Sequence, residues 1–309
     1  KCRPIGVLLM EDDKGGDEKL LCVPVNATFP YYADVKTYQD MPPLPLTLGL
    51  ELAGTVEALG PGTSGPAPGT RVAALPGSGG LADLAAVAAD RLIPIPDAMP
   101  FEVAAGFQIA YGTSHIALVQ RARLARGETL LVLGAAGGVG LTAVEIGALA
   151  GARVIAVARG AERLKIAQAA GAHHLIDSDA GDLRDKVRAL GGADVVYDPV
   201  GGASFDTGLR CLKPLGRIIV IGFASGEVPQ IRANHLLVKN IDVIGVYFGG
   251  YSGFRPDLLA DSLTTLIGWH SDGRLHPHIS HVLPRDQAQR GLDLLKNRGA
   301  TGKIVVALR

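Results

Sequence analysis

The sequence predicts an α/β protein in which a β-rich part is followed by a doubly wound parallel sheet. Up to about Pro100, short apolar runs are separated by glycine and proline, a texture typical of strands joined by tight turns. Beyond that point apolar runs alternate with helical stretches, and this alternation predicts a parallel sheet covered on both faces. A glycine cluster between one apolar run and the next helical stretch is the third observation, because such clusters form tight strand-to-helix turns.

The composition is that of a globular protein with a large core. The chain has 309 residues, 48% of them hydrophobic, and this length predicts two domains. Lys plus Arg and Asp plus Glu both number 30, so no overall charge favours nucleic acid or an anionic membrane as a partner. The 3 scattered cysteines argue against a disulfide framework and for a reducing, cytoplasmic location. No membrane span or signal peptide is expected, because polar side chains interrupt the apolar stretch 103–120 and no basic-then-apolar leader begins the chain.

The elements expected in the β-rich part are short strands bounded by glycine and proline. The runs ELAGTVEAL, TRVAAL and RLIPIP predict strands of a barrel-like unit. The following segment, FEVAAGFQIAYGTSHIALVQRARL, has a largely helical pattern and leads into the second part.

The second part contains apolar runs that predict the strands of the parallel sheet: LLVLG, RVIAVA, HLID, ADVVYD, GRIIVIG and IDVIGVY. Helical stretches such as GLTAVEIGALAG and AERLKIAQAAG lie between several of them. From about Gly249, two helical stretches and a last strand, GKIVVAL, form a tail that is too short to be a domain. We expect this tail to pack on one of the other two parts.

The glycine cluster has the features of a phosphate-binding turn. Gly134, Gly137 and Gly140 follow the strand LLVL and open a helix, whose N-terminal N–H groups and dipole attract a phosphate. Side chains at these positions would block a phosphate and widen the turn. The next strand ends about 20 residues past the cluster, the spacing expected for a dinucleotide-binding unit. A structural strand–turn–helix corner is the alternative, because it also uses glycine.

The residues after the second strand of this unit favour NADP(H) over NAD(H). A site for NAD usually carries Asp or Glu there, bound to the ribose 2′-hydroxyl. This chain has Ala158-Arg159-Gly160, and Arg163 follows one helical turn later. A guanidinium binds a 2′-phosphate with two charge-assisted hydrogen bonds, whereas an acid would repel it. The alternative is that both arginines are only solvated.

Several motifs occur in the order found in one known superfamily: IAYGTSHIAL, LGAAGGVG, YDPVGG, GRIIVIGFASG and DVIGVYFG. The chain resembles the medium-chain dehydrogenase/reductase superfamily and is most similar to its zinc-free quinone oxidoreductase branch, which includes zeta-crystallin. The resemblance implies a GroES-like catalytic domain formed by residues 1–107 and 249–309, with a Rossmann domain at 108–248. It also implies a cleft between them, NADPH as the hydride donor, and a homodimer or homotetramer.

The resemblance also implies cofactor contacts by position. The phosphate turn corresponds to Gly134, Ala135, Ala136, Gly137, Gly138, Val139 and Gly140. The 2′-phosphate contacts correspond to Arg159 and Arg163, with Ser178 where some relatives place a tyrosine. Backbone that flanks the nicotinamide and its ribose corresponds to Val200, Gly222, Phe223, Val246 and Phe248. Thr113 would lie near the nicotinamide, and Lys303 is a further candidate phosphate contact.

The zinc ligands that the chain lacks restrict the reactions that it is expected to catalyse. Zinc alcohol dehydrogenases of this superfamily carry Gly-His-Glu where this chain has Gly49-Leu50-Glu51, and they add a catalytic cysteine and a four-cysteine zinc loop. Leucine cannot bind zinc and the scattered cysteines cannot form a cysteine-rich site, so no metal is expected. A quinone or an α,β-unsaturated carbonyl is already electrophilic, and its developing oxyanion needs only hydrogen bonds. The sequence therefore favours reduction of such acceptors over alcohol oxidation.

The histidines offer weaker alternatives. His276, His278 and His281 in HPHISH could suggest a metal site, but their spacing fits no zinc pattern and the proline among them predicts a solvated loop. His115 lies two residues after Thr113 and could face the cleft. A buried, hydrogen-bonded histidine is the preferred interpretation there.

The segment expected to contact the electron acceptor is Tyr31-Tyr32-Ala33-Asp34, where relatives typically have the pattern NFxD. Asp34 keeps its place, and Tyr31 replaces the asparagine. A tyrosine hydroxyl can donate a hydrogen bond to the oxygen of a quinone or an enone, and it can supply a proton. The alternative is that these tyrosines only pack, with their hydroxyls at the surface.

The sequence thus predicts an NADPH-dependent quinone oxidoreductase that passes hydride to a quinone or to the β-carbon of a conjugated carbonyl, with Tyr31 or water as the proton source. Within the enzyme class the alternative is an enoyl-thioester reductase, which needs a longer channel. The alternative from another class is a structural or sensor protein that binds NADPH without turnover. Oxidation of NADPH by an acceptor distinguishes the enzyme from the binder.

Overall fold

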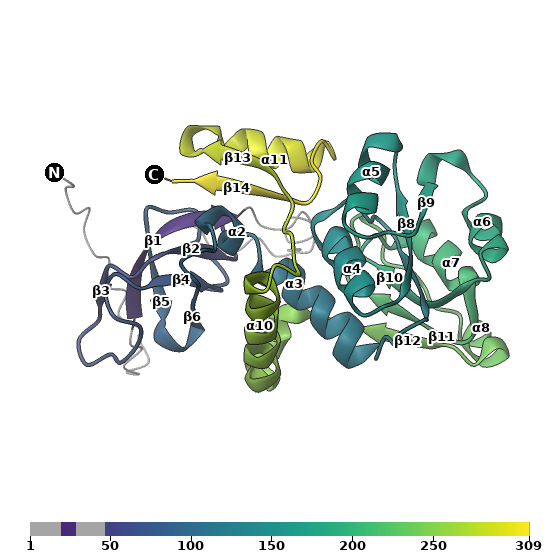
Figure 1. The fold of residues 1–309 in the computed structure, drawn as a ribbon, viewed down its shortest axis with the longest axis horizontal. Helices are drawn as coiled ribbons and strands as arrows, with labels where there is room; N and C mark the ends of the chain where they lie inside the picture. The colour runs from purple at the N-terminus through teal and green to yellow at the C-terminus, as the bar shows by residue number, and fades with distance from the viewer. Residues whose placement is uncertain (1–19, 29–46, 309) are drawn as a thin grey trace.

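Two sheets, joined by a helical segment, make up the structure (Figure 1). It is a computed structural model, and it describes residues 20–28 and 47–308. The strands of the first sheet are β1 (Leu20–Thr28), β2 (Leu52–Thr55), β3 (Ala58–Leu59), β4 (Arg71–Ala74), β5 (Leu84–Ala88), β6 (Leu92–Pro94), β13 (Ile279–Pro284) and β14 (Lys303–Ala307). The strands of the second are β7 (Thr129–Val132), β8 (Arg153–Ala158), β9 (His174–Asp177), β10 (Ala193–Asp198), β11 (Leu212–Val220) and β12 (Asp242–Gly245).

The helices connect and cover these sheets. They are α2 (Phe101–Ala105), α3 (Gln108–His115), α4 (Gly138–Leu149), α5 (Ala161–Ala169), α6 (Leu183–Ala189), α7 (Gly202–Cys211), α8 (Ala233–Lys239), α9 (Tyr251–Phe254), α10 (Pro256–Ser271) and α11 (Ala288–Lys296). A π-helical segment, Ile116–Arg121, continues α3.

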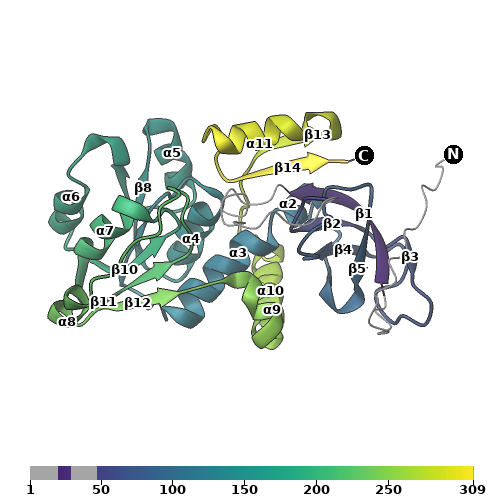
Figure 2. The same cartoon turned by 180° about the vertical axis from the view of Figure 1, so that it is seen from behind.

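Strand β1 is the centre of the first sheet. It pairs antiparallel with β2, β3, β5 and β14. Strand β13 pairs parallel with β14, while β4 and β6 extend the sheet beyond β2. Strands from the two ends of the described chain therefore share one sheet, with α11 beside β13 and β14 (Figure 2).

The second sheet is parallel throughout and has the strand order β12-β11-β10-β7-β8-β9. The predicted alternation of strands and helices is therefore confirmed. The direction of winding reverses between β7 and β10, and this reversal makes the carboxyl end of β7 a topological switch point. Doubly wound sheets bind ligands at such points, outside the carboxyl ends of their strands.

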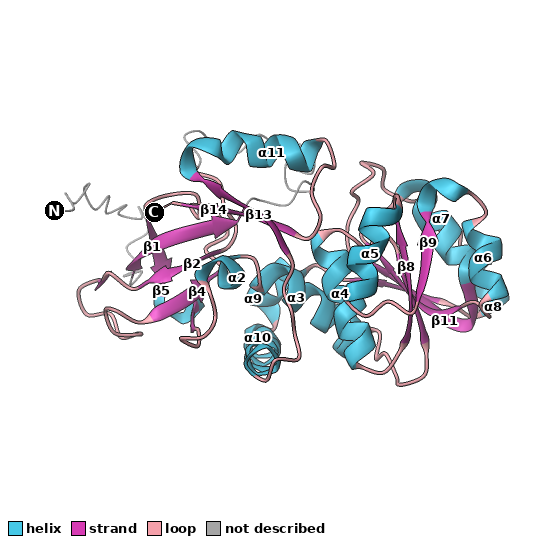
Figure 3. Ribbon diagram, turned by 45° about the horizontal axis from the view of Figure 1, so that its top comes forward, coloured by secondary structure: helices cyan, strands magenta, loops and turns pink. Residues whose placement is uncertain are grey.

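Helices cover both faces of the parallel sheet (Figure 3). Each face has its own apolar core. Leu130 and Val132 of β7 belong to the cluster that includes the buried residues of α4. Leu131 of the same strand packs in the other cluster, with Phe205 of α7 and Val187 of α6. Successive side chains of a strand point to opposite faces, which explains why an uninterrupted apolar run is needed here.

Helix α3 connects the two sheets and is held on two sides. Ser114 Oγ lies 2.9 Å from the hydroxyl of Tyr197 in β10 and 2.8 Å from Thr142 Oγ1 in α4. On another side, His115 Nδ1 lies 2.8 Å from Ser262 Oγ in α10. The buried, hydrogen-bonded interpretation of His115 is thus confirmed, and burial lowers the pKa of its imidazole. Helices α3 and α10 stand between the sheets (Figure 2).

No helix within residues 20–28 and 47–308 is long and apolar enough to cross a membrane. The longest, α10, has 16 residues and carries Asp257, Asp261 and His270. Its buried residues are Ser262, Leu263 and Leu266, which is the pattern of a helix packed on one side.

An ion pair fixes the loop that leads from the α3 segment into β7. Glu128 accepts two hydrogen bonds, each 2.7 Å long, from the guanidinium of Arg217 in β11. Arg217 Nε also donates to the backbone carbonyl of Ala122 at 2.6 Å, and only 15% of the arginine side chain is exposed. The hydrogen bonds from Arg217 lower the pKa of the Glu128 carboxyl.

We expect Glu128→Gln to lower the free energy of unfolding by about 1–3 kcal/mol, because it leaves a largely buried guanidinium without its carboxylate. Since the folded pKa of Glu128 is lowered, its stabilisation is complete above the ordinary value of about 4.3 and is lost as the pH falls through the lowered value. Denaturant unfolding between neutral and acid pH measures both effects. Glu162→Gln is the control, because the Lys165–Glu162 pair is 68% and 85% exposed. Equal losses in the two variants would contradict the assignment.

Candidate functional site

The glycine turn predicted to bind phosphate lies at the switch point, between β7 and α4. Gly134 has φ +60°, a left-handed conformation that favours glycine. A Cβ atom on Gly140 would lie 2.2 Å from the carbonyl oxygen of Gly134, so no side chain fits there. The turn is therefore narrow, and it presents the N-terminus of α4 at the carboxyl edge of the sheet, where a helix dipole attracts a phosphate.

The tail is fastened directly to this turn. Gly302 donates its N–H to the carbonyl of Ala136 at 2.9 Å, and Gly302 and Gly137 form a parallel bridge. A Cβ atom on Gly302, at φ +57°, would lie 2.3 Å from the carbonyl oxygen of His278. The strand that completes the first sheet thus begins against the glycine turn of the second.

Lys303 follows at once, and its ammonium is part of an ion pair that the sequence reasoning missed. Its Nζ lies 2.6 Å from Glu51 Oε1, and 1% of the Glu51 side chain is exposed. The other carboxylate oxygen of Glu51 accepts the N–H of Ile109, at the start of α3, at 3.0 Å. Glu51 belongs to the Gly-Leu-Glu segment, where the sequence pointed only to a missing metal ligand. The phosphate contact of Lys303 stays a prediction.

The arginines predicted to hold a 2′-phosphate follow β8 at the same edge of the sheet. Arg159 is 55% exposed, and its Nε lies 3.3 Å from the carboxylate of Asp179. Ser178 donates its hydroxyl to the same carboxylate at 3.3 Å. The guanidinium of Arg163 instead donates to the backbone carbonyl of Arg298, so α5 contacts the turn that precedes β14. Asp179, two residues after the end of β9, is the neighbour that the sequence reasoning missed.

A buried acid shapes the loop after β10. Asp198 is fully buried, and its carboxylate accepts the N–H of Val200 at 2.8 Å and that of Gly201 at 3.0 Å. Burial raises the pKa of this carboxyl, although the two backbone hydrogen bonds oppose the shift. The aspartate of the motif YDPVGG therefore fixes the position of Val200. The motif is visible in the sequence, but the sequence pattern assigns no role to Asp198.

The residues predicted to flank the nicotinamide lie where β10, β11 and β12 end. A Cβ atom on Gly134 would lie 3.1 Å from Val200 Cγ2. A Cβ atom on Gly112 would lie 2.4 Å from the ring of Phe248, so Phe248 packs directly on α3 beside Thr113, which is 6% exposed. The other members of this group are Gly222, Phe223 and Val246. The structure thus brings the glycine turn, α3 and these strand ends together at one edge.

The start of α3 carries a buried amide that the sequence did not single out. Tyr31 and Asp34 lie outside the described residues, so their roles remain predictions. Gln108, the first residue of α3, is 2% exposed, and neither its Nε2 nor its Oε1 has a hydrogen-bond partner. Buried amides in native proteins are nearly always paired, so this one calls for an explanation. Nothing in the local sequence signals it, because burial and pairing are tertiary properties.

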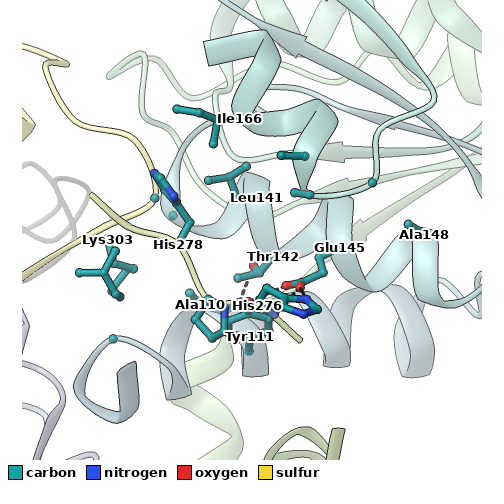
Figure 4. Close-up of a pocket in the computed structure, with 18 of the residues that line it drawn as sticks. Ala110, Tyr111, Leu141, Thr142, Glu145, Ala148, Ile166, His276, His278 and Lys303 are labelled. Atoms are coloured by element: carbon teal, nitrogen blue, oxygen red, sulfur yellow. Dashed lines mark hydrogen bonds and ion pairs between the residues drawn. The ribbon is translucent and has the colours of Figure 1, made fainter. Parts of the chain in front are cut away.

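A cavity of about 490 Å³ lies between α4, α5 and the tail (Figure 4). Leu141 and Ile166 form part of its apolar wall. Glu145 of α4 accepts a hydrogen bond from the hydroxyl of Tyr111 at 2.6 Å and one from the backbone N–H of His276 at 2.5 Å. Burial, together with the neighbouring carboxylate, raises the pKa of Tyr111. Glu145 therefore ties α3 and the tail to the helix that begins at the glycine turn.

The three histidines of HPHISH have separate partners. His276 Nδ1 lies 3.5 Å from a carboxylate oxygen of Glu145, and His278 Nε2 lies 2.9 Å from the hydroxyl of Thr301. His281, within β13, contacts the hydroxyl of the preceding serine at 3.0 Å. In the part of the chain that the structure describes, no group of at least 3 His, Cys, Asp or Glu side chains is placed to hold a metal ion.

Comparisons with known proteins place the chain among dehydrogenases and reductases. Residues 17–97 match the alcohol dehydrogenase GroES-like domain, and residues 138–262 match the zinc-binding dehydrogenase domain. The quinone oxidoreductase-like protein 2 homolog of Nematostella vectensis is 37% identical over 319 residues, which cover 99% of this chain and 87% of the relative.

Solved structures resemble the whole described fold. The quinone oxidoreductase of Escherichia coli, solved in complex with NADPH, superposes with a TM-score of 0.85 at 26% identity and covers 94% of this chain and 92% of its own. The quinone oxidoreductase of Thermus thermophilus, whose NADPH complex is also solved, has a TM-score of 0.82 at 29% identity, with 99% and 97% covered. The similarity therefore includes both sheets.

We expect Gly140→Ala to weaken NADPH binding by about tenfold or more, because the added methyl group would force the phosphate turn open. Titration of NADPH, followed by its fluorescence, measures the dissociation constant. Gly268→Ala in α10 is the matched control, since its Cβ would meet nothing within 4 Å. Unchanged NADPH affinity in a folded Gly140→Ala protein would remove the turn from the site.

Proposed function

The chain belongs to the quinone oxidoreductase branch of the medium-chain dehydrogenase/reductase superfamily, and from that premise we propose that it reduces quinones with NADPH. It is an NADPH-dependent oxidoreductase, and its cofactor is NADP(H). The observation that carries the proposal is the glycine turn at the switch point of a parallel sheet, in a chain 37% identical to a quinone oxidoreductase-like protein.

The turn fits the pyrophosphate of a dinucleotide. The space beside Gly140 is too small for a side chain, and the N-terminus of the 12-residue helix α4 faces outward from the carboxyl edge of the sheet. Bound NADPH supplies a hydride, which together with one proton converts a quinone into a hydroquinone. The protein's share is to bind both molecules, orient them and exclude water.

We assign the 2′-phosphate to Arg159, with Arg163 nearby at the start of α5. Arg159 directly follows β8, where NAD-specific sites carry an acid, and its guanidinium is exposed and positioned by Asp179. Arg163 belongs to the first turn of α5, whose dipole also favours an anion. Two guanidinium groups at this edge favour a phosphate over a hydroxyl.

The acceptor that we propose is a quinone, and a conjugated carbonyl is the close alternative. Both present a carbonyl oxygen that gains negative charge as the hydride arrives, and neutral hydrogen-bond donors suffice to stabilise that charge. Leu50 stands where the zinc enzymes of the superfamily place a histidine ligand. Water or Tyr31 is the proposed proton source.

We further propose a homodimer formed through the free edge of β12. This strand closes one side of the parallel sheet, so its outer N–H and C=O groups have no partner strand within the described chain. In the segments that flank it along the chain, Leu237, Val238 and Tyr247 are 77%, 78% and 79% exposed. A second copy that adds its own β12 would extend the ladder and cover these side chains.

We infer a cytoplasmic location from the thiols. Cys211 is free and buried, and burial raises its pKa to about 11, so it is a packing residue with little reactive thiolate. The free thiol of Cys211 packs beside the parallel sheet without forming a disulfide. A protein with free thiols suits a reducing compartment.

The first test combines cofactor selectivity with turnover. We expect the wild type to bind NADPH more tightly than NADH, and Arg159→Ala to lose about tenfold or more of this preference, because one charge-assisted pair to the phosphate is removed. Fluorescence titrations give both dissociation constants. Lys165→Ala, in the second turn of α5 with its ammonium 2.8 Å from Glu162, is the charge-matched control.

Turnover is then measured with a small quinone and, separately, with a conjugated enone. Oxidation of NADPH by the quinone supports the proposal. Oxidation by the enone alone would show that the acceptor is a conjugated carbonyl and not a quinone. Tight NADPH binding without oxidation by either acceptor would identify a binding protein instead.

The proposed dimer interface can be tested by introducing a charge into it. We expect Val238→Glu to shift the protein from dimer to monomer in size-exclusion chromatography with light scattering, because it places a charge in a covered apolar patch. Leu215→Glu, at a residue 76% exposed and on β11, is the control. A wild type that runs as a monomer would refute the interface.

A further inference from the structure

Two strand ends meet where the 2′-phosphate of NADPH is proposed to bind. Strands β8 and β9 lie side by side in the parallel sheet (Figure 3), and their last residues, Ala158 and Asp177, are register partners. Arg159 therefore leaves β8 at the same edge where the turn containing Asp179 leaves β9. No acid follows β8, where NAD-specific sites carry one, but the neighbouring strand brings two acids to this edge.

Asp177 fixes the two strand ends to each other. Its Oδ1 atom accepts the N–H of Asp179 at 3.0 Å and the N–H of Gly160 at 3.1 Å. These hydrogen bonds, that from Asp179 first, lower the pKa of the Asp177 carboxyl, which is therefore charged at neutral pH. The place of Asp179 next to Arg159 thus rests on backbone contacts and does not depend on the attraction between the two side chains.

The contact between Arg159 and Asp179 leaves most of the guanidinium available. It joins Arg159 Nε to Asp179 Oδ2 at 3.3 Å, and both side chains are more than half exposed. Among the described residues, no hydrogen bond or ion pair engages the two Nη groups of Arg159. Both groups can therefore donate to a phosphate, and an ion pair this exposed is weak enough to rearrange around a ligand.

The two carboxylates offset the positive charge that favours a phosphate at this edge. Arg159 and Arg163 supply two guanidinium groups, and Asp177 and Asp179 supply two carboxylates. Arg163 is engaged with a backbone carbonyl of the tail, and the ammonium of Lys186 donates to two backbone carbonyls of the turn after β9. A 2′-phosphate adds about two negative charges here, whereas the 2′-hydroxyl of NADH adds none. The acids therefore act against NADPH and not against NADH.

We propose that Asp179 is a selectivity-determining residue that limits the preference for NADPH over NADH, an inference that rests on the proposed function. Its carboxylate stays beside Arg159 and repels the phosphate that the Nη groups of the same arginine attract. The carboxylate is also suited to accept a hydrogen bond from the 2′-hydroxyl of NADH, as the acid after the second strand does in NAD-specific sites. NADH is therefore a second hydride donor for this enzyme, bound less tightly than NADPH.

The test is Asp179→Asn, which removes the charge and keeps an oxygen that can still accept the Nε–H of Arg159. The backbone N–H that Asp179 donates to Asp177 is also unchanged. We expect the NADPH dissociation constant to fall about threefold to tenfold, because one like charge is removed from an exposed phosphate site. The NADH dissociation constant should stay equal or rise, so the preference for NADPH increases. Fluorescence titrations with the two dinucleotides measure both constants.

Asp185→Asn is the matched control, because it makes the same change of charge at an exposed residue of α6, where the carboxylate acts on Cys211 of α7. Both dissociation constants should stay within about twofold of the wild type, since salt screens a charge on another helix. The titrations are repeated between about 50 mM and about 0.5 M salt, and the gain of Asp179→Asn for NADPH should shrink as the salt rises. A purely structural effect of the substitution would not depend on salt in this way.

The outcomes separate this inference from the proposed function. An Arg159→Ala protein that keeps the full preference for NADPH refutes the proposed phosphate site, and the role of Asp179 falls with it. Loss of the preference in Arg159→Ala, with both dissociation constants unchanged in Asp179→Asn, overturns the inference alone. Weaker NADPH binding by Asp179→Asn means that the acid only orients Arg159, which also overturns it. The same holds for a wild type that passes hydride to 1,4-benzoquinone from NADPH but not from saturating NADH.

Discussion

The arrangement of the site depends on one buried carboxylate, that of Glu51. Its two oxygens are used in different directions, one for the ammonium of Lys303 and one for the N–H of Ile109. The first contact holds β14 and the second caps the start of α3, where a negative charge also suits the helix dipole. Because the charge is almost fully buried and paired, neither partner can leave without a large cost. The helix that carries Gln108 and Thr113 is thereby fixed between the two sheets.

The sequence predicted the parallel sheet well because its strands are buried on both faces. Such strands read as continuous apolar runs, and the glycine turn has a spacing that few other structures share. The first sheet was less predictable, since its strands are short and β1 draws partners from distant parts of the chain. Pattern alone cannot say that Ala27 will lie opposite Val306, because that register is decided by tertiary packing.

The parts of the candidate site that require a particular residue type at a fixed position in a motif could be predicted from the sequence. The parts that depend on contacts between distant segments could not. Glycine at 134 and 140 is required by backbone geometry, so the motif alone pointed to it. Asp179 beside Arg159 and the unpaired amide of Gln108 arise only when separate segments meet. The same is true of Lys303, whose partner is encoded 252 positions earlier in the chain.

The pairing of β1 with β14 has a consequence for the order in which the protein takes shape. The parallel sheet is encoded without interruption between β7 and β12, so all of its strands are available once that stretch has left the ribosome. The other sheet cannot close until the segment carrying β14 has been made, because its central strand waits for a partner from the far side of the chain. During synthesis the edge of β1 therefore stays open, which makes this strand the place where chaperones or unwanted strand pairing would act first.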